Sequence, residues 1–296
     1  MASTSDFIVA GVDGSEAADA AARWAAEEAG RRHCGLTLLH AYAIPVVPEY
    51  PDYNPFPDDL SPILRDEGQK MAGRVAVDLR QAHPRLPIDV VVVAEQPTVA
   101  LRSASAGAAL TVVGSDHVNR FHGVMLGSVA LAVASTNPAP VAVIHGGQMQ
   151  RTTGPVVVGV DGSPTSDAAV AFAFQSAAAR DTTLVAVHVW NDLTVPVSHR
   201  MRETMDPARI EQEERALLAE RTAGWADKYP DVQVQRIVVQ GRAVAALLEQ
   251  SATAQLLVVG SHGRGGFTGM LLGSTSHSLI IHGTCPVVVV RPTAEH

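Results

Sequence analysis

The chain has 296 residues, of which 47% are hydrophobic and 18% charged, a composition typical of globular proteins and a length that allows two domains. Its formal net charge of −8 argues against nucleic acid or an anionic membrane as a partner. Two cysteines are too few for a disulfide framework, and the N-terminus shows no signal peptide or long apolar run. We therefore expect a cytoplasmic protein without membrane insertion.

In the first half, apolar runs typical of buried strands alternate with amphipathic stretches typical of helices. The expected strands are 7–12, 36–41, 88–94, 110–113 and 141–144. The expected helices are 15–30, 61–83, 99–106 and 128–135. This alternation predicts a parallel sheet that is covered by helices on both faces.

The second half repeats the pattern after a polar, glycine-containing stretch at 146–154. Its expected strands are 155–160, 184–190, 232–239, 256–259 and 287–291, with helices between them. We therefore expect an α/β protein of two tandem doubly wound domains, residues 1–146 and 155–296, each with a five-stranded parallel sheet.

Matched sequence blocks support a tandem duplication. Gly-Val-Asp-Gly-Ser occurs at 11–15 and 159–163, and Leu-Gly-Ser occurs at 126–128 and 272–274. Further pairs keep the same order, with an offset of 148 or 146 residues. Such self-similarity indicates two copies of one structural unit.

A glycine-rich stretch follows the expected strand 256–259. Glycines at 260, 263, 265, 266 and 269 can adopt positive φ and leave backbone N–H groups uncovered before Gly273 and Ser274 open a helix. Because the first N–H groups of a helix lack partners and its dipole favours negative charge, this stretch predicts a phosphate cradle. The alternative is a surface connection that is merely rich in glycine.

Asp161 lies just past the first expected strand of the second half. Ligands of open parallel sheets bind beyond the carboxyl ends of the strands, so Asp161 can face the glycine loop and accept a hydrogen bond from a ribose or adenine. Helix capping by Asp161 and Ser163 is the competing interpretation. The backbone N–H and C=O groups near Val189 could form hydrogen bonds with the edge of an adenine. We interpret His188 and His40 as partly buried histidines whose side chains are hydrogen-bonded within the protein.

The sequence motifs of several other nucleotide-binding, metal-binding and catalytic sites are absent. Gly-x4-Gly-Lys-Ser/Thr is absent, the chain has only Lys70 and Lys228, and no Gly-x-Gly-x-x-Gly follows the first strand of either half. No His-x3-His pair or Gly-x-Ser-x-Gly occurs, which argues against a zinc site and a serine nucleophile. Arg264 remains as a partner for a polyphosphate or, alternatively, as a solvated loop arginine.

The pattern Gly260-x2-Gly263-x9-Gly273-Ser274, with Gly-Val-Asp-Gly-Ser before it, resembles the ATP-binding branch of the universal stress protein family. The resemblance covers nearly the whole chain, in the tandem arrangement of actinobacterial members. It implies a Rossmann-like fold similar to the adenine nucleotide alpha hydrolases, and binding of ATP together with Mg²⁺. It implies no catalytic residue and no metal-ligating residue. The nucleotide-binding residues that it implies in the second copy are Val160, Asp161, Gly162, Val189, Gly260, His262, Gly263, Arg264, Gly273, Ser274 and Thr275.

The first copy matches this pattern less completely. Its corresponding residues are Val12, Asp13, Gly14, Ala41, Gly114, Gly127, Ser128 and Val129. However, His117 takes the place of Gly263, and Val118 takes that of Arg264. We expect Gly263 to use backbone angles that a residue with a Cβ disfavours, and therefore expect weaker ATP binding in the first copy.

The resemblance implies a regulator of stress survival or growth that changes its conformation or partners with nucleotide, and whose turnover is slow. A slow ATPase or a phosphoryl or nucleotidyl transferase is the alternative, and an interaction module without nucleotide is a third. The residues favour binding, because His262 is the only evident general base in the glycine loop.

Besides the nucleotide, we expect three kinds of partner. They are an unknown protein, the other domain of the same chain, and a second chain in a homodimer. The proline-rich stretch 44–62 is a candidate lid or partner surface, or an ordinary surface loop.

Overall fold

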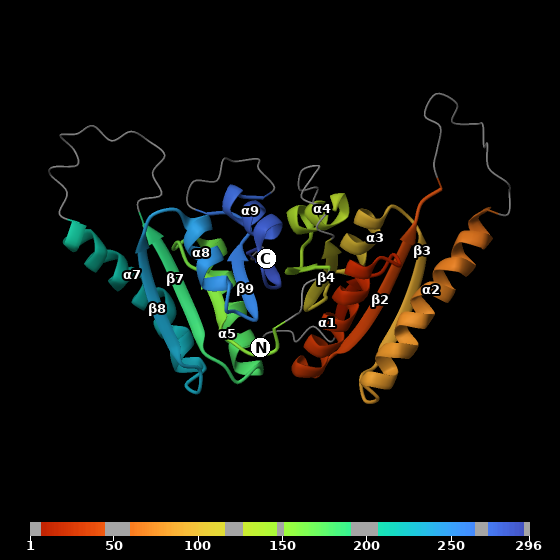
Figure 1. Cartoon of the computed structure of the whole chain (residues 1–296), viewed down its shortest axis with the longest axis horizontal. Helices are drawn as coiled ribbons and strands as arrows, with labels where there is room; N and C mark the ends of the chain where they lie inside the picture. The colour runs from red at the N-terminus through yellow and green to blue at the C-terminus, as the bar shows by residue number, and fades with distance from the viewer. Residues whose placement is uncertain are drawn as a thin grey trace, which may run out of the picture. The chain divides into compact units, whose positions relative to one another are not determined.

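The computed structural model describes residues 7–44, 60–115, 127–146, 151–190, 207–263 and 272–292. The chain separates into two compact units, Met1–Gly147 and Gln148–His296. In Figure 1 the first unit runs from red to yellow-green and the second from green to blue.

The first unit alternates strands and helices in the predicted order. Its strands are β1 (Phe7–Gly11), β2 (Gly35–Tyr42), β3 (Ile88–Ala94), β4 (Leu110–Ser115) and β5 (Val141–His145). Its helices are α1 (Glu16–Arg32), α2 (Leu60–Ala82), α3 (Pro97–Ala104) and α4 (Ser128–Thr136).

The second unit has the same succession of elements. Its strands are β6 (Val156–Gly159), β7 (Leu184–Trp190), β8 (Val234–Gln240), β9 (Leu256–Gly260) and β10 (Val287–Val290). Its helices are α5 (Pro164–Ala179), α7 (Pro207–Lys228), α8 (Ala243–Ser251) and α9 (Ser274–His282).

Each unit is a doubly wound parallel sheet of five strands, as predicted. The strands follow the order β3-β2-β1-β4-β5 in the first unit and β8-β7-β6-β9-β10 in the second, and every described pair within a unit is parallel. In the first unit α1 and α2 pack together on the sheet, whereas α3 and α4 pack together on the opposite face (Figure 1). In the second unit α5 and α7 pair in the same way, as do α8 and α9. The order reverses beside β1 and beside β6, which places a crevice at the carboxyl ends of these central strands.

Burial on both faces explains the apolar strands. The side chains of Val156, Val157 and Val158 are fully buried, because helices cover β6 from both sides. Helix α1 packs on its sheet through seven buried alanines, whose small side chains allow close approach. Predicted and observed element bounds differ by one or two residues at most ends. For example, Ser15 and Ser163 precede their helices as N-caps, since each hydroxyl accepts a backbone N–H of the first turn.

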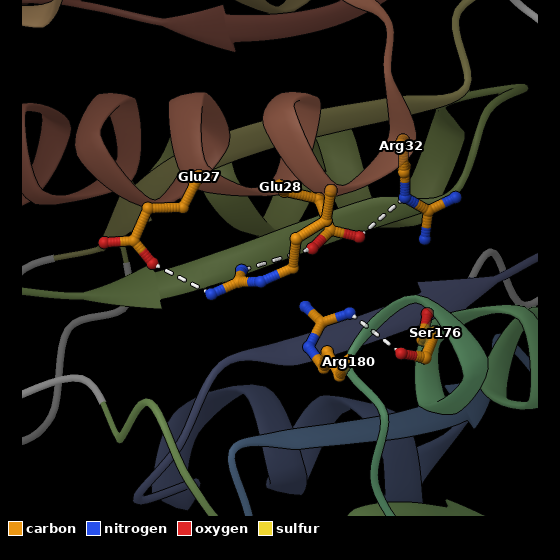
Figure 2. Close-up of polar contacts among 6 residues, drawn as sticks. Glu27, Glu28, Arg32, Ser176 and Arg180 are labelled. Carbon is orange, nitrogen blue, oxygen red and sulfur yellow. Dashed lines mark hydrogen bonds and ion pairs between the residues drawn. The ribbon is translucent and has the colours of Figure 1, made fainter. Parts of the chain in front are cut away.

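An ion-pair cluster lies at the end of α1. The Glu28 side chain is fully buried and accepts from Arg32 Nε at 2.6 Å, while Glu27 accepts from Arg31 at 3.2 Å (Figure 2). A basic last turn also suits the negative end of the helix dipole. Arg180, in the corresponding place after α5, instead donates to the carbonyl oxygen of Ser176 at 3.2 Å (Figure 2).

Within the described residues, every helix is too short or too polar to cross a membrane.

Candidate functional site

A cavity of about 540 Å³ lies in the second unit, at the carboxyl ends of β6, β7 and β9. Helices α7, α8 and α9 complete its wall. Its size is in the range of small-ligand sites, and its position is where doubly wound sheets bind ligands. The predicted residues that line it are Val160, Asp161, Val189, Gly260, His262, Gly263, Gly273, Ser274 and Thr275.

Asp161 connects β6 to the start of α5. Its Oδ1 accepts the backbone N–H of Ser163 at 2.9 Å, and Ser163 Oγ in turn caps α5 by accepting the N–H of Ser166 at 3.2 Å. The helix cap is therefore Ser163, and Asp161 orders the turn before it. Gly162 lies in this turn with φ of 78°, a left-handed conformation that favours glycine.

Gly263 lies beside the Asp161 carboxylate in the cavity wall. Its φ is outside the left-handed region, so the expectation that a Cβ is disfavoured there by backbone strain is wrong. A Cβ at this position would instead meet the end of the Asp161 side chain, at 2.6 Å from Oδ2, so the carboxylate would have to move. Gly263 thus leaves room for the carboxylate that faces the cavity.

The N-terminus of α9 forms the far wall of the cavity. Gly273 is its N-cap and provides no side-chain hydrogen bond to the first turn, so the N–H groups of that turn remain available to an anion. Ser276 Oγ donates to the carbonyl oxygen of Ser261 at 3.0 Å, and Gly273 N–H donates to the same oxygen at 2.7 Å. These bonds hold the start of α9 against the end of β9.

Gly260 has a packing role that the sequence pattern did not suggest. A Cβ there would lie 2.9 Å from Thr165 Cγ2 and 3.1 Å from the Thr165 backbone, where the first turn of α5 approaches β9. Gly114 is in the same position in the first unit, and its Cβ would collide with the backbone of Ala17 in α1. Both glycines therefore allow a helix to lie close to a strand.

His188 and Glu214 line the inner end of the cavity. His188 is 2% exposed, and its Nδ1 lies 2.6 Å from the carbonyl oxygen of Val160. Its Nε2 lies 2.8 Å from Glu214 Oε2. The side chain of His188 is thus satisfied within the wall, as interpreted from the sequence.

Glu214, Ala243 and Leu247 also line the cavity, although the sequence pattern did not point to them. Glu214 is one of several acidic residues in a strongly charged helix, and nothing in the local pattern distinguishes it from its solvent-facing neighbours. The contact between Glu214 and His188 depends on how α7 packs on β7. The alternation of apolar residues in α8 would have indicated a buried face, but not which strand end it covers.

The first unit places its corresponding residues around the ends of β1 and β4. Val12 is buried, whereas Asp13, Gly14, Gly127 and Ser128 are exposed, and Ala41 and Val129 are half-buried. Asp13 Oδ1 accepts the N–H of Ser15 at 3.0 Å, which repeats the turn at Asp161. Gly14 also repeats the left-handed conformation, with φ of 83°.

Helix α2 contacts His40 and comes near Gly14. Gly68 of α2 abuts His40, so that a Cβ at Gly68 would collide with the imidazole ring. Met71 Cγ would lie 3.6 Å from a Cβ at Gly14. The backbone of α2 therefore occupies the place beside His40 that the Glu214 side chain occupies beside His188.

Several sequence predictions fall on residues outside the described ranges. These are the loop arginine Arg264, the first-copy residues His117 and Val118, and most of the proline-rich stretch 44–62. In the part of the chain that the structure describes, no three histidine, cysteine, aspartate or glutamate side chains are grouped to hold a metal ion.

A second cavity, of about 850 Å³, lies at the opposite end of the first unit's sheet. It is lined by the end of α1, the start of β2 and the turn before β3, including His33, Cys34 and His83. This location is at the amino ends of parallel strands, away from the position at which doubly wound sheets bind ligands.

Comparison with known proteins identifies the family. A model of the universal stress protein family matches residues 6–145 and 152–291. A universal stress protein of Mycolicibacterium smegmatis is 40% identical over 293 residues, covering 96% of this chain and 97% of the relative. Another, of Mycobacterium tuberculosis, is 39% identical over 290 residues, with 96% of each chain covered. The crystal structure of a universal stress protein from Archaeoglobus fulgidus has the same fold, with a TM-score of 0.71 at 19% identity, over 99% of this chain and 98% of that one. The chain therefore belongs to the universal stress protein family and carries two of its domains in tandem.

Proposed function

We propose that this protein is an ATP-binding regulator whose principal nucleotide site is the cavity of the second unit. The observation that supports this most directly is the pairing of Asp161 with an uncapped helix N-terminus across one cavity. A carboxylate accepts hydrogen bonds from hydroxyl and amino groups, whereas a helix N-terminus binds anions. A nucleotide carries both kinds of group.

The described residues fit ATP in size and chemistry. The cavity of about 540 Å³ includes apolar lining from Val187, Val189 and Leu247 that suits a purine ring. Asp161 lies where a ribose would follow, and Gly263 leaves space beside its carboxylate. The phosphates would then reach Ser274 and Thr275 at the start of α9. Mg²⁺ would be held chiefly through phosphate oxygens, as is usual for nucleotide complexes.

The composition of the cavity wall favours binding over rapid phosphoryl transfer. Among the described residues that line the cavity there is no lysine or arginine, and the Glu214 carboxylate is bonded to His188. Phosphoryl transfer depends on positioned cations and an oriented base, so this wall lacks much of the usual machinery. We therefore propose that occupancy by ATP, rather than its consumption, carries the signal to a protein partner.

Mass spectrometry of nucleotide released from the purified full-length chain tests this function, together with calorimetric titration with Mg²⁺-ATP. We expect a bound adenine nucleotide, and we expect Asp161→Ala to weaken the tighter site by about 1–3 kcal/mol. Asp13→Ala is the matched control in the first unit and should leave the tighter site unchanged. A chain that neither carries nor binds adenine nucleotide would contradict the proposal. Turnover of roughly 1–100 per second would favour the enzyme alternative.

A further inference from the structure

The His188–Glu214 pair joins three elements at the inner end of the second unit's cavity. His188 is at the end of β7, Glu214 is on α7, and the Val160 carbonyl follows β6. The Glu214 side chain is 23% exposed and the His188 side chain 2%. The pair is therefore part of the cavity wall and not a solvated surface contact.

The two hydrogen bonds of His188 indicate where its ring hydrogens lie. A carbonyl oxygen can only accept, so Nδ1 of His188 must carry the hydrogen in its 2.6 Å contact with Val160. At Nε2, either an imidazolium donates to a Glu214 carboxylate or a protonated Glu214 donates to a neutral ring. In both forms Nδ1 carries a hydrogen and Nε2 shares one with Glu214.

This pair acts on the backbone that presents Asp161. The N–H of Val160 donates to the carbonyl oxygen of Val187 at 2.9 Å, and the carbonyl of Val160 accepts from His188. Both backbone polar groups of Val160 are thus bound to β7, one residue before the carboxylate that faces the cavity. Glu214 orients the imidazole, and the imidazole holds the carbonyl.

The first unit shows that the fold does not need a carboxylate at this position. His40 Nδ1 lies 2.9 Å from the carbonyl oxygen of Val12, which repeats the contact of His188 with Val160. Beside the ring of His40, however, α2 has Gly68, and a Cβ there would lie 3.0 Å from Nε2. Among the described residues of the first unit, the same strand, turn and histidine contact therefore form without an acidic partner, which makes Glu214 a feature of the second unit.

We propose that Glu214 is a positioning residue of the second unit's nucleotide site, which acts through His188 on the Val160–Asp161 backbone. This inference rests on the proposed function, because ATP is the ligand whose binding it supports. It predicts that removing the acid lowers nucleotide affinity while the sheet remains intact. It also predicts that an amide can replace the acid, because a glutamine NH₂ donates to Nε2 of a neutral ring that keeps its Nδ1 hydrogen.

The test is calorimetric titration of the full-length chain with Mg²⁺-ATP. Glu214→Ala should weaken the tighter site about tenfold, the effect of losing one buried hydrogen bond to a charged group. Glu214→Gln should restore affinity to within about twofold of the wild type, since a good hydrogen bond is retained. Glu213→Ala is the matched control, because Glu213 pairs with Arg209 on the exposed side of the same helix.

A second measurement needs no variant that could misfold. Nitrogen-15 NMR of the wild-type imidazole side chains should show His188 protonated at Nδ1, and a ring protonated at Nε2 alone would overturn the inference. Equal ATP affinity in Glu214→Ala and the wild type would overturn the role of Glu214 while leaving the proposed function intact. The same conclusion would follow if Glu214→Gln bound ATP as weakly as Glu214→Ala. A wild-type chain that binds no ATP would overturn both.

Discussion

A side chain at position 263 would meet the Asp161 carboxylate. Because a Cβ would lie 2.6 Å from Asp161 Oδ2, we expect Gly263→Ala to displace that carboxylate from the cavity. ATP binding should weaken by about 1–3 kcal/mol, through lost hydrogen bonds and not through backbone strain. Calorimetric titration measures the effect, and Gly224→Ala is the control, since a Cβ there meets nothing within 4 Å. An unchanged affinity in Gly263→Ala would show that Asp161 does not touch the nucleotide.

Burial changes the acidity of Cys285, which is not among the residues that line the cavity. Burial in an apolar environment raises the pKa of its thiol from 9.0 to about 12. The folded chain therefore keeps this proton at pH values where the unfolded chain loses it. The resulting stabilisation is fully present below about pH 8.5 and is lost as the pH rises toward 12.

Two measurements check this prediction. A thiol reagent at pH 8 should leave Cys285 unmodified in the folded chain and modify it after denaturation, whereas the half-buried Cys34 should react more readily. Unfolding by denaturant at pH 8 and pH 10 should show a smaller pH-dependent loss of stability in Cys285→Ala than in the wild type. Equal losses would mean that the thiol does not contribute.

Two adjacent glutamates on α1 allow a direct comparison at the level of one helix. Glu28 is fully buried and paired with both Arg32 and Arg31, whereas Glu27 is 44% exposed and paired with Arg31. Removing one partner of a buried pair leaves an uncompensated charge, so Glu28→Ala should lower the free energy of unfolding by about 3 kcal/mol. Glu27→Ala should change it by less than about 1 kcal/mol. Denaturant unfolding of both variants distinguishes the two, and similar losses would contradict this account.

The strands and helices could be predicted because each has a periodic apolar pattern. The buried valines of β6 and the alanine face of α1 make both elements evident from the sequence alone. The strand expected at 232–239 begins only at Val234, since pairing with β7 and not hydrophobicity sets its start. Glu214 was unpredictable for a related reason, because its role comes from a contact between elements and not from its neighbours in sequence. The sequence pattern marked Gly263 as a candidate, but its contact with the Asp161 carboxylate could be found only from the structure.

The two units of the whole molecule should differ in their affinity for ATP. The first copy has His117 and Val118 in the sequence positions of Gly263 and Arg264, so it lacks the small residue and the cation that the second copy offers a phosphate. We expect separately expressed residues 152–296 to bind ATP roughly tenfold more tightly than residues 1–148, a difference of about 1.4 kcal/mol. Nucleotide stoichiometry and affinity of the two halves provide the measurement. Equal affinities would show that these two loop positions do not limit binding.

The order of strands in each sheet has a consequence for biosynthesis. The central strand of each unit is the first that the ribosome releases, yet one of its two neighbours comes much later in the chain, since Ile8 pairs with Leu110 and Val156 with Leu256. Such distant pairing makes folding slow. Until β4 or β9 has emerged, one side of an apolar strand remains without its partner, and exposed strand edges promote association between nascent chains. Each unit should therefore depend most on molecular chaperones while its fourth strand is still being translated.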